Sequence, residues 1–255
     1  SFHTGARWQG FRTSPSNFTY NHIGHFATAA EAVCKAIFLG GVTRRFPELN
    51  FAFLEGGAGW ASVLLGDLIG HWEKRGGEGL RRTEPGKMDA ALMLKLAEQH
   101  GSGELLAMIR TMNGRIDGDA VSSATGGVAN LDDFSACGIE RVEDFRQLYA
   151  ERLYFGCEAD DHANVWAFQT RTSPLGARLN AMFGSDIGHF DVPDITKVVP
   201  EAYELLEDGH LSETDFRDFT FANAVRFWGK TNPSFFKGTV LERAAAEVLA
   251  ELPAR

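Results

Sequence analysis

Apolar residues recur at helical spacing between residues 21 and 39, and two glycines, Gly40 and Gly41, follow. This spacing predicts a helix that ends at the glycines. An apolar run at 50–54 predicts a buried strand, and a glycine-rich stretch after it leads into renewed helical spacing over 60–74. The order helix, strand, glycine loop, helix is typical of α/β folds.

The same alternation returns after residue 143. The predicted elements there are strands at 152–157 and within 177–183, and helices at 161–169, 196–207, 212–228 and 241–252. Ser212 is a suitable first residue for its helix, because a Ser side chain at that position accepts a hydrogen bond from the free backbone N–H groups.

The stretch between these parts, residues 76–143, is rich in charged and small residues and has weak strand signals. Helical spacing over 88–100 and 104–113 predicts two helices, and 117–133 is typical of a loop. Long connections of this kind often carry function or move. We therefore expect a helical insertion between barrel strands, or a lid.

Together these elements predict an α/β fold, and more closely about the C-terminal half of a TIM (β/α)₈ barrel. A complete barrel of this type has eight strands, whereas only about three predicted strands follow the one that ends at His3. We expect one domain overall, with barrel strands in 1–75 and 144–255. The chain begins at Ser1 without a methionine, so we expect further sequence upstream, with a trimmed N-terminus as the alternative.

Composition narrows the class of protein. Hydrophobic residues make up 44% of the 255 residues, enough for a full core, and the net charge of -9 argues against nucleic acid or an anionic membrane as partner. The expected partner is therefore a small-molecule substrate or another subunit. Cys34, Cys137 and Cys157 are too few and too widely spaced for a disulfide framework, and they fit a cytoplasmic protein. No apolar run of about 18 residues predicts a membrane span, and no signal peptide is expected.

Polar residues directly follow four predicted strands: His3, Glu55, Asp186, and the group Glu158, Asp160 and Asp161. In a barrel, polar groups at the carboxyl ends of strands converge on one mouth, where active sites lie. A histidine and several carboxylates suit Zn²⁺ or another divalent ion, which acidifies a bound water and polarises a substrate oxygen.

Three motifs, in order, resemble the amidohydrolase 2 family, which includes relatives of aminocarboxymuconate-semialdehyde decarboxylase. The first lies within 32–60 and contains FLGGV, RFPEL and FLEGGAGW; the second is FGSD at 183–186; the third is FTFAN at 219–223 with NPSFFKGT at 232–239. The resemblance spans 1–74 and 153–242.

The resemblance implies a barrel that binds a divalent ion, with Zn²⁺ expected first and Mn²⁺ second. The family's ligands are a His-x-His pair on strand 1, a His on strand 5 and an Asp on strand 8. His3 and Asp186 match the last two, so that 1–75 would hold strands 5–6 and 144–255 strands 7–8. No His-x-His occurs in this chain, which agrees with an absent first half. A homodimer is a further implication.

Glu55 occupies the strand-6 position, where the decarboxylase branch often carries histidine. We expect Glu55 to orient substrate, relay a proton or support another ligand, with a structural carboxylate next to the glycine loop as the equal alternative. For Asp186 the alternative is a helix N-cap.

Further candidates surround these positions. His22 and His25 are three residues apart at a helix start, which places them on one face; we expect a catalytic role for His25 and substrate contact or support from His22. Packing at the loop–helix junction is the alternative for both. His189, with Asp160, Asp161 and Glu158, is expected to hold substrate or to support the ligands, or else to order its loop.

We therefore expect a metal-dependent hydrolase of amidohydrolase type acting on a small carbonyl- or carboxyl-bearing substrate, in which Asp186 binds the ion and moves a proton. Non-oxidative decarboxylation is the alternative within the family, and Glu55 favours hydrolysis over it. A non-catalytic barrel or inactive fragment, suggested by the absent His-x-His, and a small-molecule binding module are alternatives from other classes.

Overall fold

The computed structural model describes residues 1–3, 14–83, 89–111 and 132–252, of which residues 2, 3, 80, 82 and 83 are described by their backbone alone. By contacts the chain divides into two compact units, residues 1–69 with 136–255, and residues 70–135. The predicted insertion at 76–143 overlaps the second unit. None of the described helices is both long and apolar enough to cross a membrane.

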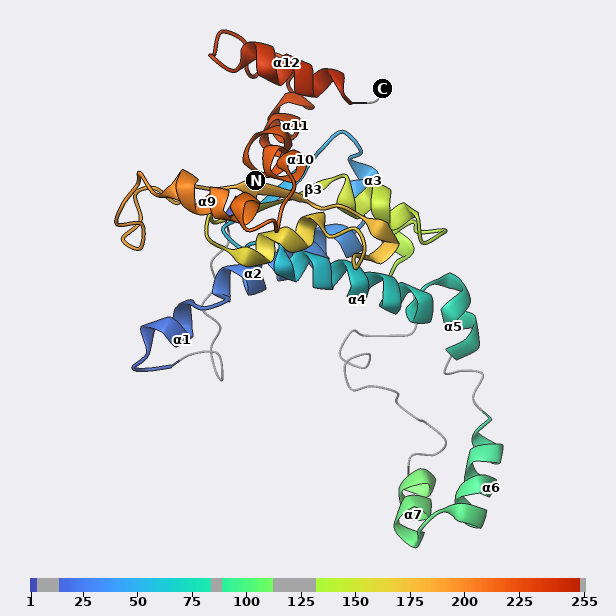
Figure 1. Cartoon of the computed structure of the whole chain (residues 1–255). Helices are drawn as coiled ribbons and strands as arrows, with labels where there is room; N and C mark the ends of the chain where they lie inside the picture. The colour runs from blue at the N-terminus through green and yellow to red at the C-terminus, as the bar shows by residue number, and fades with distance from the viewer. Residues whose placement is uncertain (4–13, 84–88, 112–131, 253–255) are drawn as a thin grey trace. The chain divides into compact units, whose positions relative to one another are not determined.

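The first unit is built on one parallel sheet whose four strands lie in chain order, β1-β2-β3-β4 (Figure 1). The strands are β1 Phe2–His3, β2 Phe51–Leu54, β3 Leu153–Cys157 and β4 Asn180–Phe183. Because parallel strands need crossover connections, each β-strand after the first is reached through helical segments.

The helices fill the connections and the C-terminal part. The α-helices of the first unit are α1 Phe18–His22, α2 His25–Leu39, α3 Val42–Arg45, α4 Gly59–Arg75, α9 Val198–Glu207, α10 Glu213–Arg217, α11 Asn223–Gly229 and α12 Glu242–Ala250, α4 extending into the second unit. Shorter 3₁₀ and π segments are η2 Ser135–Cys137, η3 Arg146–Ala150, η4 His162–Phe168, η5 Pro174–Gly176 and η6 Asp218–Ala222. The second unit contains α5 Gly77–Thr83, α6 Ala90–His100 and α7 Gly103–Thr111.

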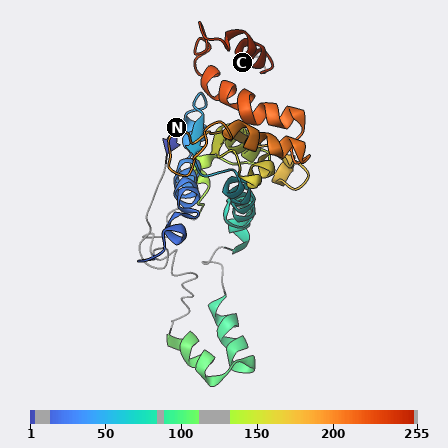
Figure 2. The ribbon, with the colours of Figure 1, turned by 60° about the vertical axis from the view of Figure 1, so that its left-hand side comes forward.

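One face of the sheet packs against α2 and α4 (Figures 1 and 2). Phe53 and Phe155 lie side by side on neighbouring strands, with ring centroids 6.1 Å apart, and Trp60 of α4 packs edge-on against both. Phe53, Phe155 and Tyr149 are fully buried. This aromatic layer holds the β2–β3 pair against α4.

The opposite face packs against α11. Tyr154 and Met182 point to this side and contact Phe227, whose ring lies 5.1 Å from that of Tyr154. The two faces follow from the alternation of side chains along a strand, since Tyr154 and Phe155 are neighbours in β3.

Among the described residues, the outer edge of β4 is bonded by a side chain and not by another strand. Asn223, buried at the start of α11, donates from Nδ2 to the carbonyl oxygen of Ala181 at 2.8 Å. Its Oδ1 accepts from Arg226, which also binds Asp218 together with Arg178. These bonds hold η6 and α11 against β4.

We expect Asn223→Ala to lower the free energy of unfolding by about 1–3 kcal/mol, because the buried carbonyl of Ala181 loses its donor. Chemical denaturation at equilibrium measures the change. Asn232→Ala is the matched control: Asn232 accepts hydrogen bonds only in the exposed turn that follows α11, where water can replace them. Equal losses in the two variants would contradict this role for Asn223.

The predicted mixed α/β class and the parallel sheet are confirmed, and all four predicted strands form. The predicted unbroken helix at 21–39 is wrong. Gly24 adopts a left-handed conformation with φ 72°, so α1 ends at His22 and α2 begins at His25. The described strands form an open sheet, with no barrel closure among them.

Candidate metal centre

Two strand ends bring their polar residues together. Glu55 follows β2 and Asp186 follows β4 after Gly184 and Ser185. With His189 from the same loop as Asp186, they offer three ligand atoms that all lie within 4.8 Å of one another. Glu55 and Asp186 are half-buried and His189 is exposed, so the group faces an opening.

The backbone at this group is unusual. Glu55 has φ 62° and Asp186 has φ 48°, and Leu175 is the one other non-glycine residue with positive φ in the described chain. Such conformations cost energy and cluster at functional sites. The surrounding loops are fixed by backbone hydrogen bonds to β3, from Gly57 N to Gly156 O at 3.1 Å and from Gly184 N to Cys157 O at 2.7 Å. These hydrogen bonds fix the loops that carry Glu55 and Asp186 against β3.

His189 is bound directly to Asp186. Its Nδ1 lies 2.5 Å from Oδ1 of Asp186, and this hydrogen bond and ion pair raise the pKa of the imidazole. The side chain of His189 is 54% exposed while that of Asp186 is 18% exposed. The bond orients both groups, as partners of metal ligands commonly do.

Glu158 adds a further carboxylate beside this group. Burial raises its pKa first, and the negative charges of Asp186, Asp160, Glu55 and Asp191 raise it further. Carboxylates that raise one another's pKa are stabilised by a cation placed among them. Two carboxylates and one imidazole within 4.8 Å are a donor set that Zn²⁺ and Mn²⁺ both accept, so the residues fit a divalent ion.

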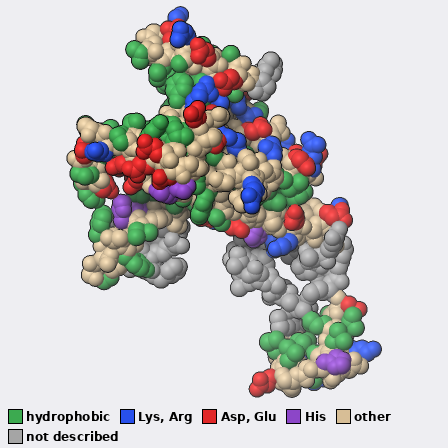
Figure 3. All heavy atoms as spheres, viewed as in Figure 1, with side chains coloured by type: hydrophobic (Ala, Val, Ile, Leu, Met, Phe, Trp, Pro, Cys, Tyr) green, Lys and Arg blue, Asp and Glu red, His purple; other side chains and the backbone are tan. Residues whose placement is uncertain are grey.

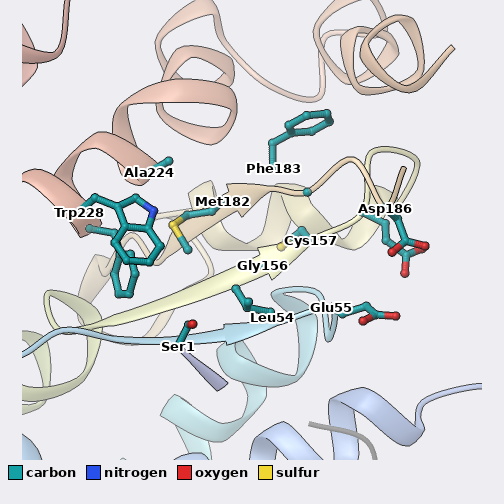
Figure 4. A pocket seen from close by; sticks show the side chains of 13 residues that line it. Ser1, Leu54, Glu55, Gly156, Cys157, Met182, Phe183, Asp186, Ala224 and Trp228 are labelled. Atoms are coloured by element: carbon teal, nitrogen blue, oxygen red, sulfur yellow. The ribbon is translucent and has the colours of Figure 1, made fainter. Parts of the chain in front are cut away.

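Two cavities border the group. One, of about 310 Å³, extends between the sheet and α11; Figure 4 shows Met182, Ala224 and Trp228 at one end and Glu55 and Asp186 at the other. The second, of about 390 Å³, is strongly acidic and lies toward α9, where Figure 3 shows acidic side chains gathered beside histidine. Glu158 and Asp186 line both cavities.

Of the other predicted site residues, some line the acidic cavity and others do not. His22 and Asp160 line the acidic cavity. Asp161 caps η4 by accepting from Ala163 N at 2.8 Å, which is a structural role. His25 stacks on Phe26 with ring centroids 4.0 Å apart and lies outside the lining of both cavities.

His3 can be placed by its backbone alone. It pairs in register with Leu54, the residue before Glu55, at the same end of the sheet. Its side chain lies outside the described atoms. The alternative role of Asp186 as a helix N-cap is wrong: in the described residues after it, the next helix begins only at Val198.

Sequence reasoning missed residues in both cavities. Asp191 and Lys197 line the acidic cavity, and Asp191 also contributes to the raised pKa values of Glu158 and His189. The spacing of Asp186, His189 and Asp191 in one short loop was the available signal. Ala224 and Trp228 of α11 had none, because their place depends on packing across the sheet.

We expect the three cysteines to be unreactive in the native protein, although Cys157 lines the apolar cavity. All three are free and buried. Burial raises the pKa of Cys34 from 9.0 to about 12. The thiolate fraction of Cys34 at pH 8 therefore falls by about 1,000-fold. Because the pKa of Cys34 is higher in the folded chain than in the unfolded chain, burial of the neutral thiol contributes fully to the free energy of unfolding below pH 9. This contribution is lost as the pH rises from 9 toward 12. Titration with a disulfide reagent, with and without denaturant, measures reactivity; rapid reaction of native protein would contradict the prediction.

The arrangement can hold a divalent ion at the carboxyl end of the sheet, next to one apolar and one acidic cavity. Asp186 can bind such an ion and exchange a proton, and His189 can orient Asp186. Comparisons of this chain with protein-family models, with curated proteins and with solved structures found no match.

Proposed function

We propose that this chain carries the metal site of a hydrolase of amidohydrolase type, acting on a small carbonyl- or carboxyl-bearing substrate. The observation that carries the proposal is the convergence of Glu55, Asp186 and His189, whose ligand atoms lie within 4.8 Å of one another. The positive φ angles of both carboxylate residues support it, because the fold bears a cost to hold them there.

The fold supports the same reading. Four parallel strands in chain order, with helices between them and polar residues at their carboxyl ends, support the proposal that this sheet is part of a (β/α)₈ barrel. His3, one residue before Glu55 in register, is proposed as a further ligand. Zn²⁺ and Mn²⁺ are the candidate ions, and the motif resemblance to the amidohydrolase 2 family favours a homodimer.

A divalent ion bound here would polarise the substrate carbonyl and lower the pKa of a water molecule. Asp186 would be one of the residues that hold the ion, and its carboxylate would accept a proton from the attacking water. As the water oxygen bonds to the carbonyl carbon, the C–N or C–O bond would break, and Asp186 would return that proton to the leaving group. His189 holds the Asp186 carboxylate in place through its 2.5 Å hydrogen bond. Glu55 would supply the second negative charge that holds the ion.

Metal analysis and product analysis test the proposal. The full chain is loaded with Zn²⁺ or Mn²⁺, dialysed, and measured for bound metal; about one ion per chain is expected. Loaded protein should convert neutral amides or esters, and a chelator should abolish the conversion. Release of CO₂ from an acid substrate without incorporation of water would indicate decarboxylation instead. Absence of both stoichiometric metal and turnover would favour a non-catalytic role and overturn the proposal.

A further inference from the structure

The cavity beside the candidate metal centre is lined at its far end by apolar side chains. Its far end is formed by Met182 of β4 and by Ala224, Phe227 and Trp228 of α11. Among the described residues that line it there is no lysine or arginine. Its charged side chains are three carboxylates, those of Glu55, Glu158 and Asp186, and Figure 4 shows the labelled pair Glu55 and Asp186 together at one end.

The charges remain unfavourable for an anionic ligand after metal binding. One divalent ion would balance the charges of Glu55 and Asp186, and Glu158 is a third carboxylate in the same lining. Proteins that bind a substrate carboxylate usually present arginine or lysine to it. A carboxylate in this cavity would lose its water and would face the apolar side chains of α11 and the like charges of three carboxylates.

Size limits the ligand further. An apolar cavity of about 150 Å³ is large enough to hold benzene. The cavity here, about 310 Å³, therefore has room for one ring with a short chain attached to the reacting carbonyl.

We propose that the substrate is an uncharged amide or ester whose body is a single ring or short alkyl chain, lodged against Met182 and Ala224 with its carbonyl at Asp186. This inference rests on the proposed function for the reaction, but the cavity's preference for uncharged ligands is a separate property. It can be measured in metal-free protein.

Two probes of matched shape test the preference. Butyranilide is neutral, and succinanilic acid carries a carboxylate where butyranilide carries a methyl group. Calorimetric titration of the chelated full chain should show butyranilide binding about 100-fold more tightly, because the apolar wall rejects the charge. Equal affinities, tighter binding of the acid, or no binding of either probe would overturn the inference. Hydrolysis of the same probes after metal loading tests the proposed function separately, so binding without turnover would overturn only the latter.

A second experiment introduces a positive charge into the part of the cavity lining that α11 forms. Ala224→Lys should narrow the preference for butyranilide by about tenfold or more, because its ammonium group can pair with the carboxylate of the acid. Ala246→Lys, an exposed alanine on α12, is the matched control and should leave the ratio unchanged. If Ala224→Lys loses helical signal, Trp228→Lys places the charge on the same helix at a position that is 43% exposed. An unchanged ratio in a folded variant would contradict the inference.

Discussion

Asp186→Asn is expected to lower the hydrolysis of a neutral anilide or ester by the metal-loaded chain by about 10³-fold, since several kcal/mol of charge stabilisation in the transition state depend on the ion it holds. The amide carries no charge to retain the ion, and it cannot accept the proton of water. Asparagine is the least disruptive replacement, because it is one of the few residues that tolerate the positive φ found at Asp186. The fold should therefore remain while the site is lost.

Three measurements separate these effects. Metal titration should show weaker binding of Zn²⁺ and Mn²⁺, thermal unfolding without metal should be nearly unchanged, and turnover should fall. Asp208→Asn is the control, because Asp208 is the C-cap residue of α9 and lies outside both cavity linings. A variant at Asp186 that retained full metal content and activity would remove Asp186 from the site.

Local patterns were sufficient for the strands and for most helices. The runs at 50–54 and 152–157 contain alternating or continuous apolar residues, and both became strands because their side chains enter the two faces of the sheet. The break between α1 and α2 was missed because apolar spacing continues across it, although Gly24 with φ 72° was a visible signal. That break also removes the reason for placing His22 and His25 on one helical face.

The candidate site was predictable only in part. Glu55 and Asp186 follow strands, and parallel strands bring their carboxyl ends to one edge, so their meeting follows from topology. The contact of His189 with Asp186 depends on the path of an irregular loop, for which the sequence has no periodicity. The wall formed by α11 depends on packing between segments more than forty residues apart, such as Met182 and Phe227.

Phe155→Ala is expected to lower the free energy of unfolding by about 3–5 kcal/mol. Phe155 is fully buried in β3, between β2 and β4, and its ring contacts those of Phe53, Trp60 and Tyr149. Removal of the ring loses its burial and leaves a cavity that these large neighbours cannot fill. Since domains of this kind have a total stability of about 5–15 kcal/mol, the loss is a large share.

Equilibrium unfolding in urea measures the loss as a lower midpoint with an unchanged slope. Phe190→Ala removes the same atoms from a side chain that is 79% exposed, and it should change stability by less than about 0.5 kcal/mol. Equal losses in the two variants would contradict the assignment of Phe155 to the core.

Stabilisation by bound metal distinguishes a defect in the core from a defect in the candidate metal centre. Zn²⁺ or Mn²⁺ at about 100 times its dissociation constant should add about 2.7 kcal/mol to any chain that binds it only when folded. We expect the native chain and Phe155→Ala to gain this same amount, because Phe155 packs on the α4 face and is absent from the described lining of the apolar cavity. Asp186→Asn should gain almost nothing. Phe155→Ala should therefore lower stability without lowering metal affinity. Asp186→Asn should lower metal affinity with little change in the stability of the metal-free chain.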